Sequence, residues 1–331
     1  SGNKIIQHID RTTAMNSIQY ITIEPAQTQP VFSVVICSVN KEKYNLCRDN
    51  IAATIGVDTE FIRVDNAAAK WPISKAYNNG ASVASAPNVL FIHEDVLFEN
   101  SGWGAAMARK LAEPETGVIG FIGVPFRLGA YAGWNECSEL VSGHIYYIMD
   151  GQRICWHQEP WADGKLTGGE FAPVLVVDGL GFAVRREVWQ AHPFDEVVLD
   201  AFHCYDIDFC MQVALTHRNY VYLKADITHF SNGNMDSRWV EQTLRLSEGK
   251  WKEMMPMCVP GCEPANPEKI MARADYDFLF KAVRGRANRN QAARILRHFI
   301  KKSMHSKAYR SKLPSAIWQV LIKYHKLPSR T

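Results

Sequence analysis

Three carboxylates and one histidine are the residues whose type and position point most directly to chemistry in this sequence. Asp95 closes the segment His93-Glu94-Asp95, directly after an apolar run. Asp206 and Asp208 lie near a predicted helix start. Acids there favour the positive end of the helix dipole, but one of the two would also suit a general base, which takes a proton from a reacting hydroxyl. A lone histidine is usually structural, but His229 follows the last predicted strand at the sheet edge of Asp95, which makes a role as metal ligand more plausible than for an average histidine.

Short apolar strands alternate with helices along the chain and would position these side chains. The predicted strands cover 32–38, 60–65, 88–95, 174–178 and 221–223, with a short β-like stretch near Ile21. The predicted helices cover 41–55, 73–85, a segment from about Arg185, 206–216, and most of the chain after Gly233. This alternation is typical of βαβ units in a mainly parallel central sheet with helices on both faces.

Polar residues follow two further strands at the edge where ligands bind in an open parallel sheet. Ser38 and Asn40 come after the first predicted strand, and Asp65 and Asn66 come at the end of the second. Any one of them could also be an ordinary loop group or a helix N-cap. The chain has no GxGxxG after the first strand and no GxxxxGKS or GxxxxGKT motif, which argues against a dinucleotide-binding fingerprint and a P-loop.

Residues 125–171 are rich in Gly, Trp and Tyr and carry little periodicity, which predicts an irregular functional loop region. Trp134, within Gly133-Trp-Asn135, is the ring that we expect to contact a sugar. Core packing is the alternative role for each aromatic residue of this segment.

The composition is that of an ordinary globular protein. The 331 residues are 47% hydrophobic, 21% charged and 11% aromatic, which excludes whole-chain disorder and small disulfide scaffolds. No run approaches the ~18 consecutive apolar residues of a membrane-spanning helix, and the first residues lack the apolar core of a signal peptide. We therefore expect a cytoplasmic protein, either soluble or peripheral on the inner face of the cell membrane.

The net charge of +3 conceals a strong segregation. Residues 281–331 contain 14 Lys and Arg and no Asp or Glu, which leaves 23 basic against 34 acidic residues before them. Apolar residues recur there at helical spacing, among them Ile295, Phe299 and Trp318. Two interpretations stay open: a basic amphipathic anchor on an anionic membrane, or helices packed on the rest of the protein with these three side chains buried. No binding motif accompanies the charge to support nucleic acid as a partner.

The order of several weak motifs is more specific than any of them alone. Ser-Val-Asn at 38–40 is followed by Val64-Asp-Asn66, Ala76-Tyr-Asn-Asn-Gly-Ala81, Leu90-Phe-Ile-His-Glu-Asp-Val96, Asp178-Gly179 with Arg185-Arg186, Tyr205-Asp-Ile-Asp208 and His229-x-Ser-x-Gly233. In this order the motifs resemble a GT-A glycosyltransferase of the family 2 type, most closely the subgroup named for a streptomycin-biosynthesis protein. The resemblance implies a Rossmann-like GT-A domain over 31–233, between an N-terminal segment (1–30) and a helical C-terminal extension (234–331) that is strongly basic from 281.

The resemblance also implies roles for individual residues. Asp95 would ligate a divalent cation, Mn²⁺ or Mg²⁺, with His229 as a second ligand, while His93 stands where the family has the first aspartate of its Asp-x-Asp signature. Asp206 matches the acidic base, with Asp208 as the alternative. Trp134 and Asp178 would contact the acceptor. The implied donor-binding residues are Ser38, Asn40, Asp65, Asn66, Asn78 and Glu94.

The function that these observations favour is a metal-dependent, inverting glycosyltransferase of the hexosyltransferase type. Its donor would be a nucleotide-diphospho-sugar, a UDP-sugar first, and its acceptor a growing glycan or a lipid-linked saccharide. A non-catalytic GT-A-like module that binds a glycan or a partner is the alternative. A nucleotide-sugar pyrophosphorylase is disfavoured, because no Gly-rich phosphate loop follows the first strand.

Overall fold

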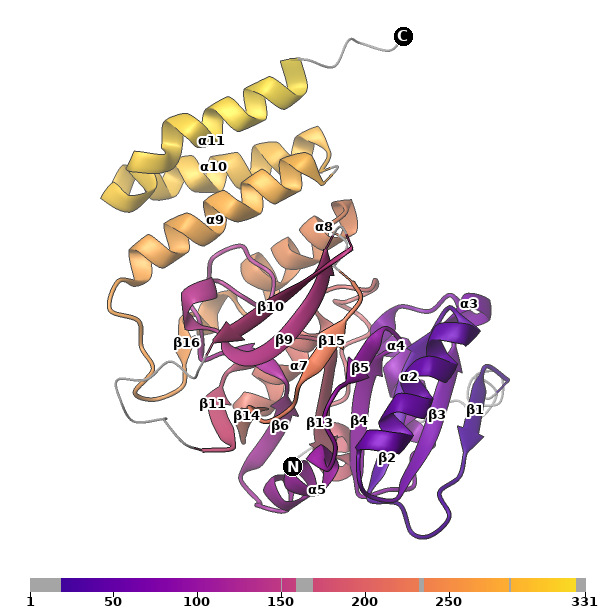
Figure 1. The fold of residues 1–331 in the computed structure, drawn as a ribbon. Helices are drawn as coiled ribbons and strands as arrows, with labels where there is room; N and C mark the ends of the chain where they lie inside the picture. Colours follow the sequence, from indigo (N-terminus) through magenta and orange to yellow (C-terminus); the bar gives the residue numbers. More distant parts are fainter. Residues whose placement is uncertain (1–18, 150, 159–168, 232–234, 286, 326–331) are drawn as a thin grey trace, which may run out of the picture.

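A computed structural model describes residues 19–149, 151–158, 169–231, 235–285 and 287–325. Its centre is an eight-stranded sheet in the order β1-β3-β2-β4-β13-β6-β14-β11 (Figure 1). Strands β3, β2, β4, β6 and β14 run in one direction, because β13 is antiparallel to both of its neighbours. In sheet order the strands are Ile21–Glu24, Thr59–Asp65, Phe32–Ser38, Asn88–His93, Gly181–Arg185, Thr116–Gly120, Arg218–Tyr222 and Phe171–Val174.

A second sheet adjoins the first, in the order β12-β7-β9-β15-β5, with β10 paired to β9 outside this path. In that order, and with β10 last, its strands are Val176–Val177, Ile122–Val124, Ser142–Met149, Ile227–His229, Val96–Phe98 and Gln152–Gln158. A short ladder joins β8 (Phe126–Arg127) to β16 (Met257–Cys258). Strand β5 begins just after β4 ends, so the two sheets meet at the predicted ligand edge.

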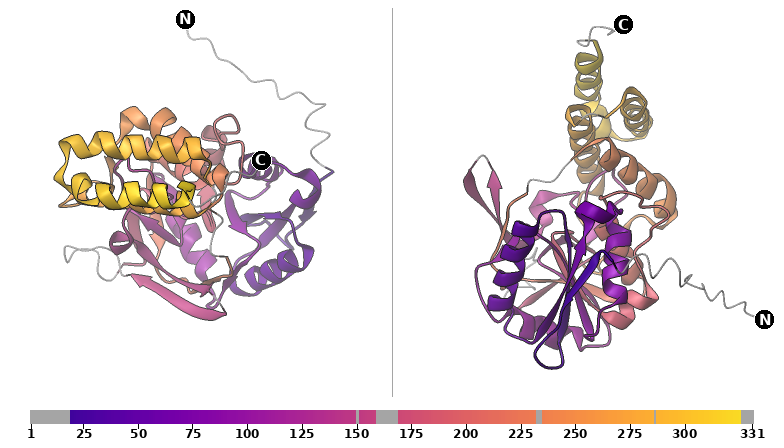
Figure 2. Two further views of the ribbon diagram at one scale, coloured as in Figure 1. Left: turned by 90° about the horizontal axis from the view of Figure 1, so that it is seen from above. Right: turned by 90° about the vertical axis from the view of Figure 1, so that its right-hand side faces the viewer.

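Helices lie on both faces of the central sheet (Figure 2). The helices of the described residues are α2 (Lys41–Thr54), α3 (Asn66–Ala69), α4 (Ile73–Ser82), α5 (Trp103–Leu111), α6 (Arg186–Ala191), α7 (Tyr205–Ala214), α8 (Ser237–Arg245), α9 (Pro267–Arg284), α10 (Arg289–His305) and α11 (Lys307–His325), of which the last three lie beyond the sheet. Short helical turns cover Ser138–Leu140, Leu246–Lys250 and Lys252–Met254. Helix α4 packs closely on the sheet, because a Cβ atom on Gly80 would lie 2.4 Å from Cγ1 of Val35.

The local sequence explains the elements that carry the ligand edge. Strand β2 reads FSVVICS and is buried along nearly its whole length, as expected for a parallel strand covered on both faces. Asn40 caps α2 by accepting a hydrogen bond from the backbone N–H of Lys43 at 2.9 Å. The polar residue at the strand end therefore starts the next helix.

The expected fold class is confirmed, including the helices after residue 233, but two predicted strands and one predicted loop differ. Residues 174–178 do not form one strand, because the chain passes from β11 in the first sheet to β12 in the second. The predicted strand 221–223 does not lead directly to His229, because residues 221 and 222 end β14 and a separate strand β15 carries His229. The segment 125–171 is not wholly irregular, since it contains the antiparallel pair β9 and β10.

The C-terminal helices pack against α8 around a second apolar core, beyond the central sheet (Figure 1). Ile295 and Phe299 of α10 are fully buried there, beside Trp239 of α8. Trp318 of α11 does not share this environment, because 62% of its surface is exposed. Within the described residues, no helix is both long and apolar enough to cross a membrane.

Candidate active site

A cavity of about 820 Å³ lies at the carboxyl ends of β2 and β4. This volume falls within the ~300–1,000 Å³ of typical small-molecule sites. Cys37 of β2 and His93 of β4 form one wall, and the opposite wall includes Trp134 and residues of α7, α8 and α9. The sheet edge predicted from the sequence is therefore hollowed.

Three side chains in this cavity form a cluster with the donor atoms of a metal site. One nitrogen or oxygen each of His93, Asp95 and His229 lies within 4.8 Å of the other two. Strand pairing explains their meeting, because His229 of β15 is opposite Val96 of β5 in the antiparallel register. The predicted pair of Asp95 and His229 thus converges although 134 positions separate the two residues.

The cluster fits a divalent cation. His229 is 6% exposed, and neither of its ring nitrogens makes a well-formed hydrogen bond with a described residue, although Nε2 lies 3.3 Å from Oδ1 of Asp95. Burial, together with the charge of His229, lowers the pKa of His93 to about 4, so this imidazole is neutral at pH 7. Burial alone would raise the pKa of Asp95, but contact with His229 brings it below its usual value. Neutral imidazole and ionised carboxylate are the forms that bind Mn²⁺ or a similar ion.

His93 is a candidate ligand that the sequence interpretation did not assign. Its Nε2 lies 2.8 Å from the hydroxyl of Tyr205, which in turn donates to the carbonyl oxygen of Gly179 at 2.7 Å. These two hydrogen bonds hold the His93 ring against Tyr205, the first residue of α7. Its position in the Asp-x-Asp motif, two residues before Asp95, was the available signal.

Asp206 has the environment of a general base. It lies in the first turn of α7, is 8% exposed, lines the cavity, and accepts a hydrogen bond from the backbone N–H of Gly179 at 2.9 Å. Burial and the neighbouring charge of Asp178 raise its pKa to about 7. Asp178 also lines the cavity, and burial raises its pKa as well. A carboxylate that titrates near neutrality suits proton transfer at physiological pH.

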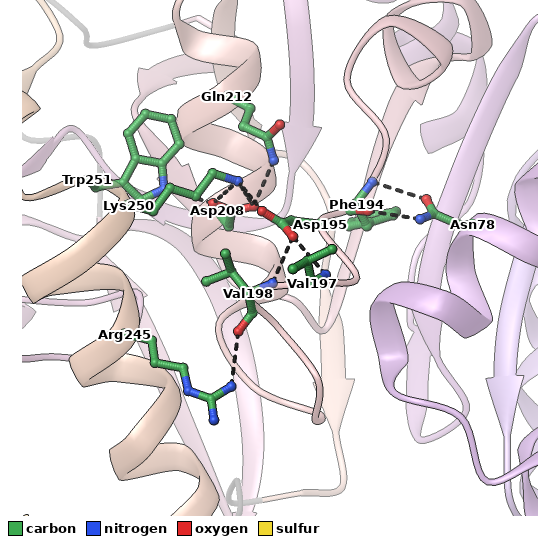
Figure 3. A network of polar contacts seen from close by, with 10 residues as sticks. All are labelled: Asn78, Phe194, Asp195, Val197, Val198, Asp208, Gln212, Arg245, Lys250 and Trp251. Atoms are coloured by element: carbon green, nitrogen blue, oxygen red, sulfur yellow. Dashed lines mark hydrogen bonds and ion pairs between the residues drawn. The ribbon is translucent and has the colours of Figure 1, made fainter. Parts of the chain in front are cut away.

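Asp208 belongs to a separate network of polar contacts (Figure 3). It is fully buried, outside the cavity lining, and accepts hydrogen bonds from Gln212 Nε2 at 2.7 Å, Trp251 Nε1 at 2.8 Å and Lys250 Nζ at 2.9 Å. Lys250 also binds Asp195 at 2.8 Å. The carboxylate therefore ties α7 to the segment after α8.

The residues expected to bind the donor divide into two groups. Asn66 and Glu94 line the cavity, and Glu94 accepts a hydrogen bond from the backbone N–H of Asn40 at 3.2 Å. Ser38 and Asp65 lie at the ends of their strands but outside the lining, as Asn40 does. Asp65 and Asn40 each cap the helix that follows.

Asn78 does not join the cavity. Its amide oxygen accepts from the backbone N–H of Phe194 at 3.1 Å, and its amide nitrogen donates to Phe194 O (Figure 3). The oxygen also accepts from Trp189 Nε1 at 3.1 Å, and the nitrogen also donates to Glu196. Its side chain therefore holds α4 against the segment after α6.

The segment that carries Trp134 is held in place by buried charges. Trp134 lines the cavity. Behind it, Arg127 donates to the carbonyl oxygen of Gly133, and Glu136 accepts from the backbone N–H of Leu128 at 2.7 Å. From the C-terminal extension, Asp275 accepts from the backbone N–H of Tyr131 at 2.6 Å. The extension thus supports the wall of the site, which the sequence did not predict.

Comparison with known proteins adds the family. None of the curated proteins matches the chain. The chain is similar to GalNAc-T7 solved with UDP, GalNAc and Mn²⁺, at 12% identity and a TM-score of 0.49. The similarity covers 69% of this chain and 49% of that one, so this chain spans about half the length of GalNAc-T7. It is also similar to the mannosyltransferase PcManGT from Pyrobaculum calidifontis with GDP-Man and Mn²⁺, at 12% identity and a TM-score of 0.43 over 96% and 94% of the two chains. A third similar structure is S. aureus TarS 1–349, at 13% identity and a TM-score of 0.40 over 91% and 93%.

The family model described as "Glycosyltransferase like family" matches residues 33–252. The match spans well over half of the chain and contains Asp95, Asp206 and His229. This chain therefore belongs to the glycosyltransferase-like family.

Proposed function

We propose that this protein is a metal-dependent, inverting hexosyltransferase of the GT-A type. It moves a sugar from a nucleotide-diphospho-sugar, a UDP-sugar first, to a hydroxyl of a glycan or a lipid-linked saccharide. The observation that carries the proposal is the convergence of the His93, Asp95 and His229 cluster with Asp206 in a single cavity. The proposal also includes membership of the subgroup named for a streptomycin-biosynthesis protein and a GT-A domain over residues 31–233.

The cluster would hold Mn²⁺ or Mg²⁺ beside the donor diphosphate. A divalent cation there offsets the negative charge that accumulates on the leaving nucleoside diphosphate. Asn66 and Glu94, at the ends of β3 and β4, would contact the donor from the other wall of the cavity. The histidine nitrogens in the cluster favour Mn²⁺ over Mg²⁺, which prefers oxygen ligands and retained waters.

Asp206 would take the proton of the acceptor hydroxyl. Its raised pKa keeps it close to the point of titration at pH 7, and the bond from Gly179 fixes one oxygen so that the carboxylate keeps its orientation. Trp134 and Asp178 would position the acceptor on the same side. A single base opposite the leaving group leads to inversion at the anomeric carbon.

The basic extension supports a membrane-facing partner. Residues 281–331 have no acidic side chain, and α11 exposes Trp318, Leu321 and Ile322. Exposed apolar side chains among Lys and Arg fit an anionic lipid surface, where each basic residue contributes about 1 kcal/mol. A lipid-linked acceptor and a position on the cytoplasmic membrane face would follow.

Isothermal titration of UDP, GDP, CMP and dTDP sugars, with and without Mn²⁺, tests the function. We expect one donor to bind in a Mn²⁺-dependent manner, and Asp95→Asn to lose the Mn²⁺ dependence. Asp49→Asn is the matched control, because Asp49 is an exposed carboxylate outside the cavity. Failure of every donor to bind in the presence of Mn²⁺ would contradict the proposal. Tight donor binding without transfer to any glycan would instead favour a binding module.

A further inference from the structure

A smaller cavity of about 170 Å³ adjoins the main one, between the segment 132–138 and α9. Four residues line both cavities and so mark their junction. These are Gly133 and Asn135 after β8, Trp239 of α8 and Lys281 of α9. The junction thus combines the aromatic segment with the C-terminal extension.

The indole of Trp239 contributes a hydrogen-bond donor that has no partner among the described residues. The side chain is 9% exposed, and within the described part of the chain its Nε1–H has no acceptor. A Cβ atom on Gly133 would lie 3.9 Å from this nitrogen, so the donor faces the junction. A buried indole N–H normally finds an acceptor, and this one has only the cavity in front of it.

Asn135 and Lys281 add two more donors. Oδ1 of Asn135 accepts from the backbone N–H of Cys137 at 2.8 Å, which leaves its amide nitrogen as a donor with no acceptor among the residues that the structure describes. Lys281 forms no ion pair with a described residue, and it is the one Lys or Arg in the described lining of the main cavity. The junction therefore offers three donors and a full positive charge.

The walls of the junction are fixed before any ligand arrives. Asp275, which precedes Lys281 on α9, accepts hydrogen bonds from the backbone N–H of Tyr131 at 2.6 Å and from the hydroxyl of Tyr309 at 2.5 Å. The Trp239 ring packs on Phe278 of α9, with centroids 4.7 Å apart. Preorganised donors bind an anion with a smaller entropic cost than mobile ones.

The other charges at the smaller cavity already have partners. Glu136 lies 3.5 Å from the buried Arg127, and Asp277 lies 3.9 Å from Arg273. Lys281 is therefore the one charged side chain in the described lining of the smaller cavity for which the structure shows no ion pair. A neutral saccharide would leave that charge without a counter-charge, whereas a phosphate or carboxylate would meet all three donors.

We propose that Asn135, Trp239 and Lys281 form an acceptor subsite for an anionic oxygen group, a phosphate or a carboxylate carried by the acceptor. This inference rests on the proposed glycosyltransferase function and adds the acceptor's charge. The group belongs to the acceptor because Asn66 and Glu94, the donor-side residues, do not line the smaller cavity. The junction lies on the side of Trp134 instead.

Calorimetry on the full chain tests the subsite with the donor site filled. The protein is saturated with Mn²⁺ and the nucleoside diphosphate that it binds, and is then titrated with glucose 6-phosphate, glucuronate or glucose. We expect the two anions to bind at least tenfold more tightly than glucose. Lys281→Met should remove this preference, and Trp239→Phe, which deletes only the N–H and part of the ring, should weaken anion binding severalfold. Lys269→Met is the matched control, an exposed lysine of the same helix that lines neither cavity.

Each other outcome counts against the subsite. Equal affinities for glucose and glucose 6-phosphate in the wild-type protein, or no binding of either anion, would overturn it. If Lys281→Met weakens the nucleoside diphosphate and leaves the anions unaffected, the lysine serves the donor and the acceptor assignment is wrong. Failure of the wild-type protein to bind any nucleoside diphosphate with Mn²⁺ would instead overturn the proposed function.

Discussion

The backbone N–H of Phe230 donates to the carbonyl oxygen of Asp95 at 3.0 Å, which extends the β5–β15 ladder to the edge of the cavity. This bond places His229 beside Asp95, so the cluster depends on strand pairing and not on a flexible loop. A site built on strands is held more rigidly than one built on loops.

The first prediction concerns metal binding. His229→Gln keeps a polar side chain at β15 but removes the imidazole, so Mn²⁺ affinity should fall at least tenfold, with nucleotide affinity measured in EDTA unchanged. Mn²⁺ titration followed by electron paramagnetic resonance measures the affinity. His144→Gln is the control, because this histidine of the neighbouring strand β9 pairs with Asp226 outside the cavity. An unchanged Mn²⁺ affinity in His229→Gln would show that His229 is not a metal ligand.

The second prediction concerns the base. Asp206→Asn should lower the transfer rate by about 10²–10⁴, because only the proton-accepting function is removed, while the donor Kd stays within twofold. In the wild-type protein, kcat/KM should rise with pH up to about 7 and then level off, since the ionised form is the active one. A wild-type kcat/KM that falls as the pH rises to about 7 would show that Asp206 is not the base.

The third prediction is that the Asp206 carboxyl makes the free energy of unfolding fall as the pH rises, whereas it makes kcat/KM rise. Burial raises the pKa of Asp206 from 3.8 to about 7, so its contribution to stability is present at low pH and is lost as the pH rises through 7. Asp206→Asn does not titrate, so its stability relative to wild type should improve by about 2–3 kcal/mol between pH 5 and pH 8. Urea unfolding at the two pH values measures this difference, and a constant difference would contradict the raised pKa.

Asp208 should behave as a structural residue. Asp208→Asn keeps the shape but weakens the bonds from Lys250 and Trp251, and we expect a loss of about 1–3 kcal/mol in the free energy of unfolding. The Kd for the donor and the rate of transfer should stay close to wild type at a temperature where the variant is folded. A rate loss as large as that of Asp206→Asn would show that both carboxylates take part in the chemistry.

Local patterns were sufficient to predict the elements that bear the site. The apolar run of β2 and the cap at Asn40 are local signals, and they placed the strand and the start of α2 correctly. Asp95 and His229 were paired in the prediction because both follow strands, and strands of a sheet share an edge. By contrast, the hairpin of β9 and β10 was missed, because its Gly and aromatic residues obscure the alternation of a strand.

Tertiary contacts decided what the sequence left open. Asp206 and Asp208 are about 200° apart around α7, so only one of them can face the cavity, and the sequence does not tell which. Two of the side chains that fix Asp208 are Lys250 and Trp251, and both lie more than forty positions away in the sequence. The donors of Trp239 and Lys281 likewise reach the cavity only because α8 and α9 fold back over the segment after β8.

The last prediction concerns the outer face of the C-terminal extension. Ile295 and Phe299 are buried against α8, so part of the basic segment is packed as one interpretation required, whereas Trp318, Leu321 and Ile322 of α11 are exposed. These three residues lie three and four positions apart along α11, which places them on one face of the helix, opposite the buried Tyr309 and Ala316.

If this face lies on anionic lipid, Trp318→Ser with Leu321→Ser should reduce co-sedimentation with phosphatidylglycerol vesicles at least tenfold without loss of the folded state. Binding of the wild-type protein should weaken as salt rises past physiological ionic strength, where the Debye length is ~8 Å. The control Val197→Ser removes an exposed apolar side chain far from the extension in sequence, with 88% of its surface exposed, and should leave vesicle binding unchanged. Equal sedimentation of the wild-type protein and the double variant would show that α11 faces something other than lipid.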